Sequence, residues 1–250
     1  MTIRFNKVLF AAIAVPAVSI MSGCASTDTS KDSSVAVVSS PAVAAPTGIT
    51  SVNFDNLTAG TQIDMADASW SVEKVNGSTL VAEVSANMAK SGSNSLYLLD
   101  DSTADKPYAL LKFANGAATA GSISFDAYIP STNPKTVYVN VGTGKNNSQR
   151  YFELRLNATD GVVQYENGSE DVKVADFTTD AWHTYNATWA DGKFSISIDG
   201  QPSASATNVS VASTGLSASN IPTTITFYAG DKSSAGTEAY IDNIESTLFK

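Results

Sequence analysis

Residues 182–200 read WHTYNATWADGKFSISIDG, and this stretch decides the fold. Every second residue of its two halves is apolar or aromatic, which is the pattern of strands with one buried face. Asp191-Gly192 separates the halves and supplies the positive φ angles of a two-residue hairpin turn. Asp199-Gly200 repeats that turn signal at the far end. The side chains predicted to share the buried face are Tyr185, Ala187, Trp189, Phe194, Ile196 and Ile198.

The same alternation recurs between about Ile49 and Lys250, and no stretch keeps helical periodicity beyond two turns. About ten or more short strands, separated by Gly, Asp and Asn turns, predict an all-β domain built as a two-sheet antiparallel sandwich. Its core is expected to be about 10 Å thick. The other strands are predicted at 95–100, 108–113, 121–130, 135–141, 150–157, 162–166, 223–230 and 238–248.

The N-terminal region has a different composition. Residues 1–23 combine a basic head with an apolar run and small residues, which is typical of a secretory signal peptide. Residues 21–24, MSGC, resemble the bacterial lipobox, whose cysteine is lipidated. Cys24 is the only cysteine, so an intramolecular disulfide is excluded. Residues 24–48 are rich in Ser, Ala, Val, Thr and Pro and are predicted to be a flexible tether, which leaves 49–250 as the folded domain.

Charge limits the choice of partners. Removal of residues 1–23 takes away two basic residues, which leaves 13 basic against 24 acidic side chains and a net charge of −11. A surface with this much negative charge argues against nucleic acid and anionic lipid headgroups as binding partners. Ala25 follows Cys24, and by resemblance to Gram-negative sorting rules this predicts an outer-membrane location. We expect the mature protein to be a monomer that touches the membrane only through its lipid anchor.

Residues 176–200 resemble the tryptophan-rich hairpin of concanavalin A-like jelly rolls, a superfamily that includes laminin-G-like domains, lectins, glycoside hydrolases and polysaccharide lyases. Residues 54–61, 91–96 and 240–244 resemble the edges of jelly-roll carbohydrate-binding modules. This resemblance covers most of residues 50–248 and implies a two-sheet antiparallel jelly roll. It does not name one activity, because one fold hosts many functions.

A sugar site needs aromatic side chains beside the pyranose ring and a few planar polar groups for its hydroxyls. The outward positions of the central strands offer both, and residues 142–150 are expected to form a polar lip above them. The alternative is that outward tyrosines reflect β-propensity alone. The predicted ligand-binding residues are Tyr138, Asn140, Tyr151, Glu153, Arg155 and Tyr228, with Tyr128 as a further outward tyrosine.

Other catalytic arrangements find little support. His183 is the only histidine and is expected to be structural, and neither a Gly-x-Ser-x-Gly elbow nor a zinc-ligand set is present. Glycoside hydrolysis needs two carboxylates, and the Glu-x-Asp-x-x-Glu motif of the superfamily's glucanases is absent. Glu153 is the best-placed acid, with Glu166 or Asp126 as a possible neighbour. The alternative is an ordinary pair between Glu153 and Arg155.

Residues 150–155, RYFELR, resemble the Arg-x-Glu-Leu-Arg strand of jelly-roll alginate lyases. A lyase needs a group that neutralises the uronate carboxylate and a base that removes the C5 proton. The Gln-Ile/Val-His and Tyr-Phe-Lys-Ala-Gly motifs of that family are absent. Without that histidine, only a tyrosine such as Tyr138 or Tyr228 remains as the base.

Jelly-roll modules often hold a structural Ca²⁺ between a carboxylate near the first strand and one in the last. Asp55 and Asp242 match these positions, and carbonyls around residues 90–93 would complete the oxygen shell. Asp100 and Asp101 are less well placed. The alternative is that Asp242 caps a turn or bulge.

The sequence therefore predicts a carbohydrate-binding lipoprotein that binds a polysaccharide or oligosaccharide on the concave face of the sandwich, with no catalytic residue. A polysaccharide lyase acting on uronate-containing glycans is the enzymatic alternative. An envelope structural or adhesion lipoprotein is the third hypothesis.

Overall fold

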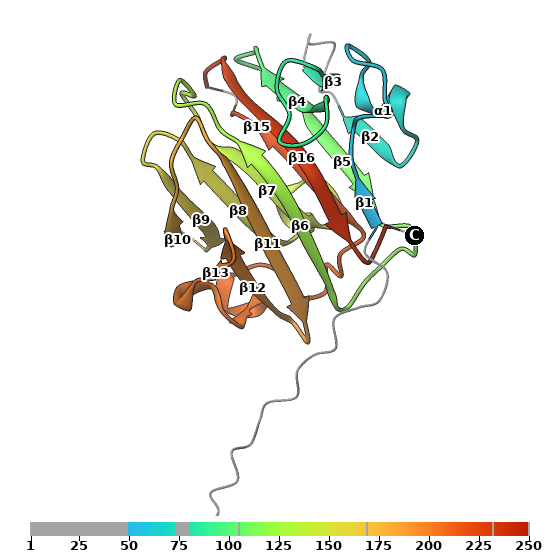
Figure 1. The fold of residues 1–250 in the computed structure, drawn as a ribbon. Helices are drawn as coiled ribbons and strands as arrows, with labels where there is room; N and C mark the ends of the chain where they lie inside the picture. Colours follow the sequence, from blue (N-terminus) through green and yellow to red (C-terminus); the bar gives the residue numbers. More distant parts are fainter. Residues whose placement is uncertain (1–49, 74–80, 105, 169, 232, 250) are drawn as a thin grey trace, which may run out of the picture. The chain divides into compact units, whose positions relative to one another are not determined.

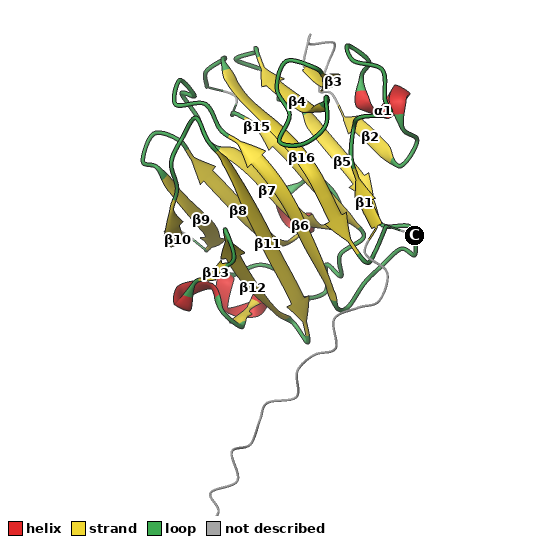
Figure 2. Cartoon of the chain, viewed as in Figure 1, coloured by secondary structure: helices red, strands yellow, loops and turns green. Residues whose placement is uncertain are grey.

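The structure is a computed structural model that describes residues 50–73, 81–104, 106–168, 170–231 and 233–249 (Figure 1). The predicted signal peptide, Cys24 and the tether lie outside the described residues. Short helices occupy a small part of the described chain, and strands form most of it (Figure 2). The helices are α1 (Ile63–Ala66), η1 (Asn147–Gln149), η2 (Ala204–Ala206) and η3 (Val211–Thr214).

The described strands form two antiparallel sheets, which confirms the predicted all-β sandwich. The nine-stranded sheet has the order β13-β12-β11-β6-β16-β4-β3, with β1 paired to β16 and β14 paired to β12. Its strands are β1 (Thr50–Val52), β3 (Val81–Ser85), β4 (Ser95–Asp100), β6 (Gly121–Tyr128), β11 (Trp182–Ala190), β12 (Lys193–Ile198), β13 (Gln201–Pro202), β14 (Val209–Ser210) and β16 (Thr237–Ser246).

The seven-stranded sheet has the order β10-β9-β8-β7-β15-β5-β2. Neighbours in this order are often far apart in sequence: β7 pairs with β15 and β15 with β5. The central strands therefore bring together side chains from distant parts of the chain. Its strands are β2 (Trp70–Glu73), β5 (Tyr108–Lys112), β7 (Val137–Gly142), β8 (Arg150–Asn157), β9 (Val162–Asn167), β10 (Glu170–Asp176) and β15 (Thr224–Ala229).

The hairpin of β11 and β12 forms where the sequence predicts it. Asp191 and Gly192 have φ angles of 51° and 72°, and Trp189 pairs with Phe194. Asp199 and Gly200 make a second such turn into β13. These positive φ angles at both turn residues are what a right-twisted two-residue hairpin requires.

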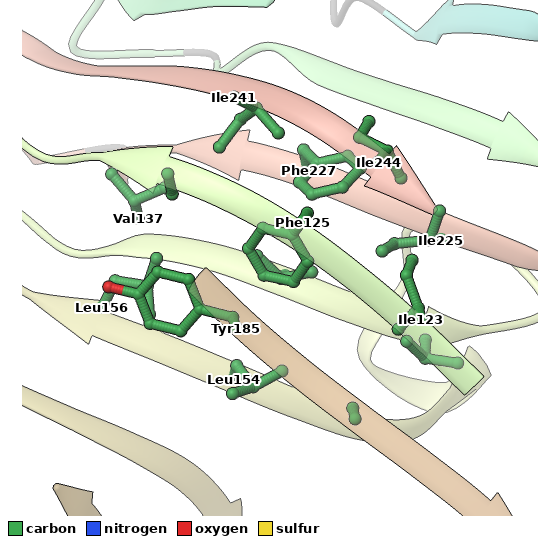
Figure 3. Packing of buried hydrophobic residues seen from close by; sticks show 14 of the residues in the cluster. Ile123, Phe125, Val137, Leu154, Leu156, Tyr185, Ile225, Phe227, Ile241 and Ile244 are labelled. Carbon is green, nitrogen blue, oxygen red and sulfur yellow. The ribbon is translucent and has the colours of Figure 1, made fainter. Parts of the chain in front are cut away.

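The core lies between the sheets (Figure 3). Phe125 of β6 stacks on Tyr185 of β11, and its ring meets Phe227 of β15 edge-on, each at 5.3 Å between centroids. Val137, Val139 and the other alternating residues of the central strands are buried as predicted. Burial of these aromatic and branched side chains is the main force that holds the two sheets together.

Candidate functional site

The outer face of the seven-stranded sheet, opposite the core, carries most of the predicted ligand-binding residues. Strand register places Tyr228, Tyr138 and Arg155 side by side in one row across β15, β7 and β8. Asn140 and Glu153 pair in the next row. Directly paired residues of neighbouring strands share a face, so these five side chains form one cluster, which we call the outer-face cluster.

Tyr151 does not join the outer-face cluster. Phe152 pairs with Val141, but Gly142 pairs with Arg150, so Tyr151 is the extra residue of a β-bulge. Tyr151 packs with the core at 3% exposure, and burial raises the pKa of its hydroxyl. The expectation that simple alternation turns Tyr151 outward is therefore wrong, because the bulge shifts the alternation by one residue.

Arg150 takes the outward position instead and lies at the centre of an ionic network. Its Nε is 2.8 Å from Glu153 Oε2, and its Nη1 donates to Glu166 Oε2 at 2.8 Å. Its Nη2 donates to the Tyr228 hydroxyl at 3.0 Å. That hydroxyl in turn donates to Glu153 Oε2 at 2.5 Å. The four side chains thereby fix one another beneath the surface of the face.

Arg155 extends this network to the next two strands. Its Nε donates to Glu153 Oε1 at 3.0 Å, and its Nη1 donates to Asp171 Oδ1 at 2.5 Å. Its Nη2 lies 3.2 Å from Glu166 Oε1. The pairing of Glu153 with Arg155 that the sequence left open is thus present, as part of a larger network in which Glu153 has no exposed surface.

The protonation of this network follows from burial and pairing. Burial raises the pKa of Glu153, while Arg150 opposes that shift. Burial, the charge of Glu153 and its hydrogen bond together raise the pKa of Tyr228 well above its usual value of 10.0. Burial disfavours the charge of Arg155, but Asp171 and Glu153 outweigh it and raise the pKa of the guanidinium. Tyr228 therefore keeps its proton, and both arginines stay charged.

The tyrosine rings of this face pack against one another. Tyr138 stacks on Tyr228 with centroids 4.6 Å apart and planes 8° apart, and Tyr108 of β5 lies 5.1 Å beyond Tyr228. Arg155 Cζ is 5.9 Å from the Tyr138 centroid. Lys106 Nζ lies 4.5–5.6 Å from the centroids of all three rings, a cation–π arrangement. These close neighbours favour presentation of ring edges and polar tips to a ligand.

The predicted lip, residues 142–150, closes over part of the face. The Gly144 carbonyl accepts a hydrogen bond from Asn140 Nδ2 at 2.8 Å, and Asn140 has no exposed surface. Lys145 Nζ reaches Glu73 Oε2 of β2 at 2.6 Å and lies 5.4 Å from the Tyr108 centroid. Asn140 therefore holds the lip in place, and direct contact with a ligand is not its role in this arrangement.

The two predicted metal ligands lie on either side of the loop 90–94. Asp242 Oδ2 accepts the amides of Lys90 and Ser91 at 2.9 and 3.1 Å. Asp55 Oδ1 accepts the amides of Ser93 and Asn94 at 2.7 and 3.1 Å. The loop thus directs amide hydrogens toward these carboxylates, and this donor set fits turn capping better than a calcium cage. Among the described residues no group of three or more His, Cys, Asp or Glu side chains is placed to hold a metal.

Sequence reasoning missed several members of this face. It correctly turned Tyr128 outward, but it grouped Tyr128 with tyrosines that lie on the other sheet. Tyr128 belongs to β6 of the nine-stranded sheet, where its ring meets Tyr240 at 6.2 Å. The outward position of Arg150 was not predicted, because it results from the bulge. The only sequence signal of this bulge is the extra residue in the RYFELR motif. Pairing between distant segments brings three further side chains to this face. They are Tyr108 in β5 and the loop residues Lys106 and Lys145. The residues missed are Tyr108, Lys106 and Asp171, whereas Lys145 and Arg150 belong to the predicted lip, 142–150.

No helix in the described ranges is long and apolar enough to cross a membrane.

Neither a protein-family model nor a curated protein matches the chain. Several solved structures have a similar fold, and three of them are carbohydrate-related proteins by name. A sialidase superposes with a TM-score of 0.56 at 16% identity, over 79% of this chain and only 18% of the sialidase. A carbohydrate esterase from the Shiga toxin-encoding bacteriophage phi24B gives 0.53 at 16% identity, over 80% of this chain and 98% of the esterase.

The cellulose-induced protein Cip1 gives a TM-score of 0.52 at 14% identity, over 72% of this chain and 91% of Cip1. At such identities the likeness is one of fold. It agrees with the two-sheet β-sandwich that the sequence predicts.

Proposed function

We propose that this protein binds a polysaccharide or oligosaccharide on the outer face of the seven-stranded sheet and does not cleave it. The fold neighbours named above are carbohydrate-related proteins, and this supports a carbohydrate-related role in general. The proposal of binding depends on the outer-face cluster itself, which combines tyrosines, arginines and carboxylates on adjacent strands.

One observation carries the proposal: partly exposed polar groups rest on a buried network that fixes them. The side chains of Arg155 and Asp171 are 22% and 27% exposed, whereas Glu153 beneath them is fully buried. A site whose side chains are already ordered loses little conformational entropy when a ligand binds. Planar groups fixed in this way suit the paired hydroxyls of a sugar ring.

The contacts between the protein and the glycan are inferred from the side chains of the outer-face cluster that remain accessible. Tyr138 is partly exposed, and we infer that a sugar ring packs along its edge while Arg155 and Asp171 bind hydroxyls. Tyr228 and Glu153 lie beneath these groups and are too deeply buried to touch the ligand. Their role is to hold Arg155 and Tyr138 in position.

The lyase alternative has one observation in its favour and one against it. The bulge brings Arg150 beside Glu153 and Arg155, as the resemblance of RYFELR to the alginate-lyase strand implies. However, Tyr228 is 1% exposed and its pKa is well above 10.0, so it is a poor base for a substrate proton. Burial also raises the pKa of Tyr138. Binding without bond cleavage is therefore the better-supported function.

A glycan array with the purified protein tests this proposal. We expect Tyr138→Ala and Arg155→Ala to weaken glycan binding at least about tenfold, because each removes a partly exposed contact group. Tyr240→Ala is the matched control: its ring stacks on Tyr97 at 4.8 Å on the other sheet, and its loss leaves binding unchanged. Equal loss in all three variants, or none in any, contradicts the assignment of the face.

The enzymatic alternative is tested on the same samples. Incubation with alginate, ulvan or pectin is followed by ultraviolet absorbance, which rises when a lyase forms an unsaturated product. A rise that Arg155→Ala abolishes establishes the lyase and overturns the binding proposal. No glycan binding and no product together favour the structural or adhesion role.

We also propose that the domain is anchored through acylated Cys24 at the outer membrane, with residues 24–48 as its tether. The lipobox resemblance and the single cysteine support this attachment.

A further inference from the structure

Lys106, in the loop before β5, differs from the other basic side chains of the outer face. It is only partly exposed, and it forms no ion pair with any residue that the structure describes. The basic side chains around it each contact carboxylates. They are Arg150, Arg155 and Lys145, which pair with Glu153, Glu166, Asp171 and Glu73. The ammonium of Lys106 is therefore the cation of this group that still lacks an acidic partner within the described ranges.

The ammonium of Lys106 lies over the tyrosine rings where the sugar is proposed to pack. Its Nζ is 4.5 Å from the centroid of Tyr228, 5.5 Å from that of Tyr138 and 5.6 Å from that of Tyr108. Strand register places Arg155 on the other side of Tyr138, with Cζ 5.9 Å from that centroid. Tyr138 therefore lies between two cations, of which only Arg155 is ion-paired among the described residues.

The rings compensate only part of the hydration that this ammonium loses. Cation–π contact stabilises the charge, but a ring face supplies no counter-charge. Burial lowers the pKa of Lys106, and the charge of Arg150 adds to this shift. More distant carboxylates oppose the shift without reversing it, and they are Glu153, Asp231 and Asp100. An anion that binds the ammonium directly would supply the missing charge-assisted hydrogen bond.

The distribution of charge favours binding of an anion at this place. The chain has 15 basic and 24 acidic side chains and a net charge of −9, so most of its surface is expected to repel anions. The outer face differs from this average, because four basic side chains gather beside three tyrosines. A ligand that combines an acidic group with a pyranose ring matches this local arrangement of cations and aromatic rings.

Given the glycan binding proposed above, on which this step rests, we propose that the outer face recognises an acidic sugar. The carboxylate or sulfate of the sugar accepts hydrogen bonds from Lys106 Nζ, while its ring packs along Tyr138 and its hydroxyls reach Arg155. Uronic acids and sulfated sugars share this chemistry, since both carry oxyanion oxygens on a pyranose ring. A neutral sugar leaves the charge of Lys106 without a counter-ion and therefore binds more weakly.

A glycan array of uronate-containing and sulfated oligosaccharides tests the proposal, with each glycan paired with its carboxyl-reduced or desulfated neutral counterpart. We expect the wild-type full chain to bind at least one anionic class about tenfold more tightly than its neutral counterpart. Lys106→Met is expected to remove this preference. Lys106→Arg keeps the charge and is expected to retain it. The class that shows the preference identifies the acidic group as a carboxylate or a sulfate.

Lys112→Met is the matched control. Lys112 is an exposed residue of β5, about 13 Å along the strand from Tyr108, so its substitution removes one positive charge and leaves the tyrosines in place. The proposal is overturned if the wild type binds neutral counterparts equally well, if Lys106→Met keeps the preference, or if Lys112→Met also loses it.

Tyr138→Ala separates this proposal from that of glycan binding, because it is expected to weaken binding of the anionic and the neutral glycans alike. Binding that depends on Tyr138 but not on the charge of the glycan overturns only the acidic sugar. A wild-type chain that binds no glycan overturns the glycan site itself, and the acidic sugar with it.

Discussion

Glu153 shows how one residue organises the outer face. It is fully buried, yet its two oxygens meet Arg150, Arg155 and the Tyr228 hydroxyl. A buried carboxylate is stable only where such partners compensate for lost hydration. The same partners hold Arg155 and the Tyr228–Tyr138 stack in fixed positions, so Glu153 links the stability of the sheet to the shape of its surface.

Glu153→Gln is therefore expected to lower the free energy of unfolding by about 3 kcal/mol, since it leaves the buried Arg150 and the partly exposed Arg155 short of a counter-charge. Urea denaturation followed by intrinsic fluorescence measures this change. Glu166→Gln is the matched control. Its side chain is 16% exposed, and about 1 kcal/mol or less is expected. Equal stability of the two variants contradicts the central position of Glu153.

At the scale of elements, the bulge in β8 determines which side chains reach the outer face. Gly142 pairs with Arg150 and lies so close to the Gln149 carbonyl that a Cβ at 142 would overlap it. Glycine at this position lets the bulged strand approach β7. The bulge then turns Arg150 outward and Tyr151 toward the core, which creates the Arg150–Glu153–Arg155 group.

The hairpin of β11 and β12 carries a second element-scale feature, at the turn after β12. Asp199 Oδ1 accepts the Thr184 amide at 2.9 Å, and its Oδ2 lies 2.7 Å from His183 Nδ1. Desolvation works to raise the pKa of Asp199, but the bonds from His183 and Thr184 outweigh it and hold that pKa below 3.8. His183 thus contributes to the structure of the hairpin, the role expected of it.

The sign of the resulting pH dependence is fixed by that lowered pKa. The ionised Asp199 carboxylate stabilises the fold above a pH of about 4, and this contribution is lost as the pH falls toward the folded-state pKa. Asp199→Asn is expected to lower the free energy of unfolding at pH 7 by about 0.5–1 kcal/mol, because the hydrogen bonds are partly exposed. Its stability is expected to fall less steeply below pH 4 in acid denaturation.

Asp191→Asn is the control for this prediction. Asp191 and Asp199 both have a φ of 51°, a conformation that asparagine tolerates, so both substitutions keep the turn backbone. A similar loss of stability in the two variants contradicts the assigned interaction of Asp199.

At the scale of the whole molecule, the sandwich brings together segments from across the chain. The outer-face cluster draws on β7, β8 and β15. The proposed glycan site therefore belongs to the folded domain, whereas the predicted anchor belongs to the N-terminal segment.

This separation predicts that Cys24→Ser abolishes partition into the detergent phase while glycan binding stays at the wild-type level. Phase separation in a nonionic detergent, followed by the glycan array on both fractions, measures the two properties together. A version starting at residue 49 is expected to give the same far-ultraviolet circular dichroism and Tm as Cys24→Ser. Detergent partition that survives the substitution contradicts acylation at this residue.

The sequence by itself determined the strands, the turns of the hairpin and the buried faces. These features are local, since alternation and Asp-Gly turns act through neighbouring residues, as at Asp191-Gly192 and Phe125. Tyr138, Glu153 and Arg155 were placed on one face by the same local argument, which holds for them because no bulge interrupts β8 between residues 153 and 155.

Only the tertiary structure decided the rest. It placed Tyr128 on the other sheet, turned Arg150 outward in place of Tyr151, and covered Asn140 with the lip. Burial and side-chain hydrogen bonding arise from contacts between residues far apart in sequence, such as Arg150 with Tyr228 and Asp100 with Gly230. The local sequence pattern does not predict such contacts, because they depend on how distant strands pair and where a bulge shifts their register.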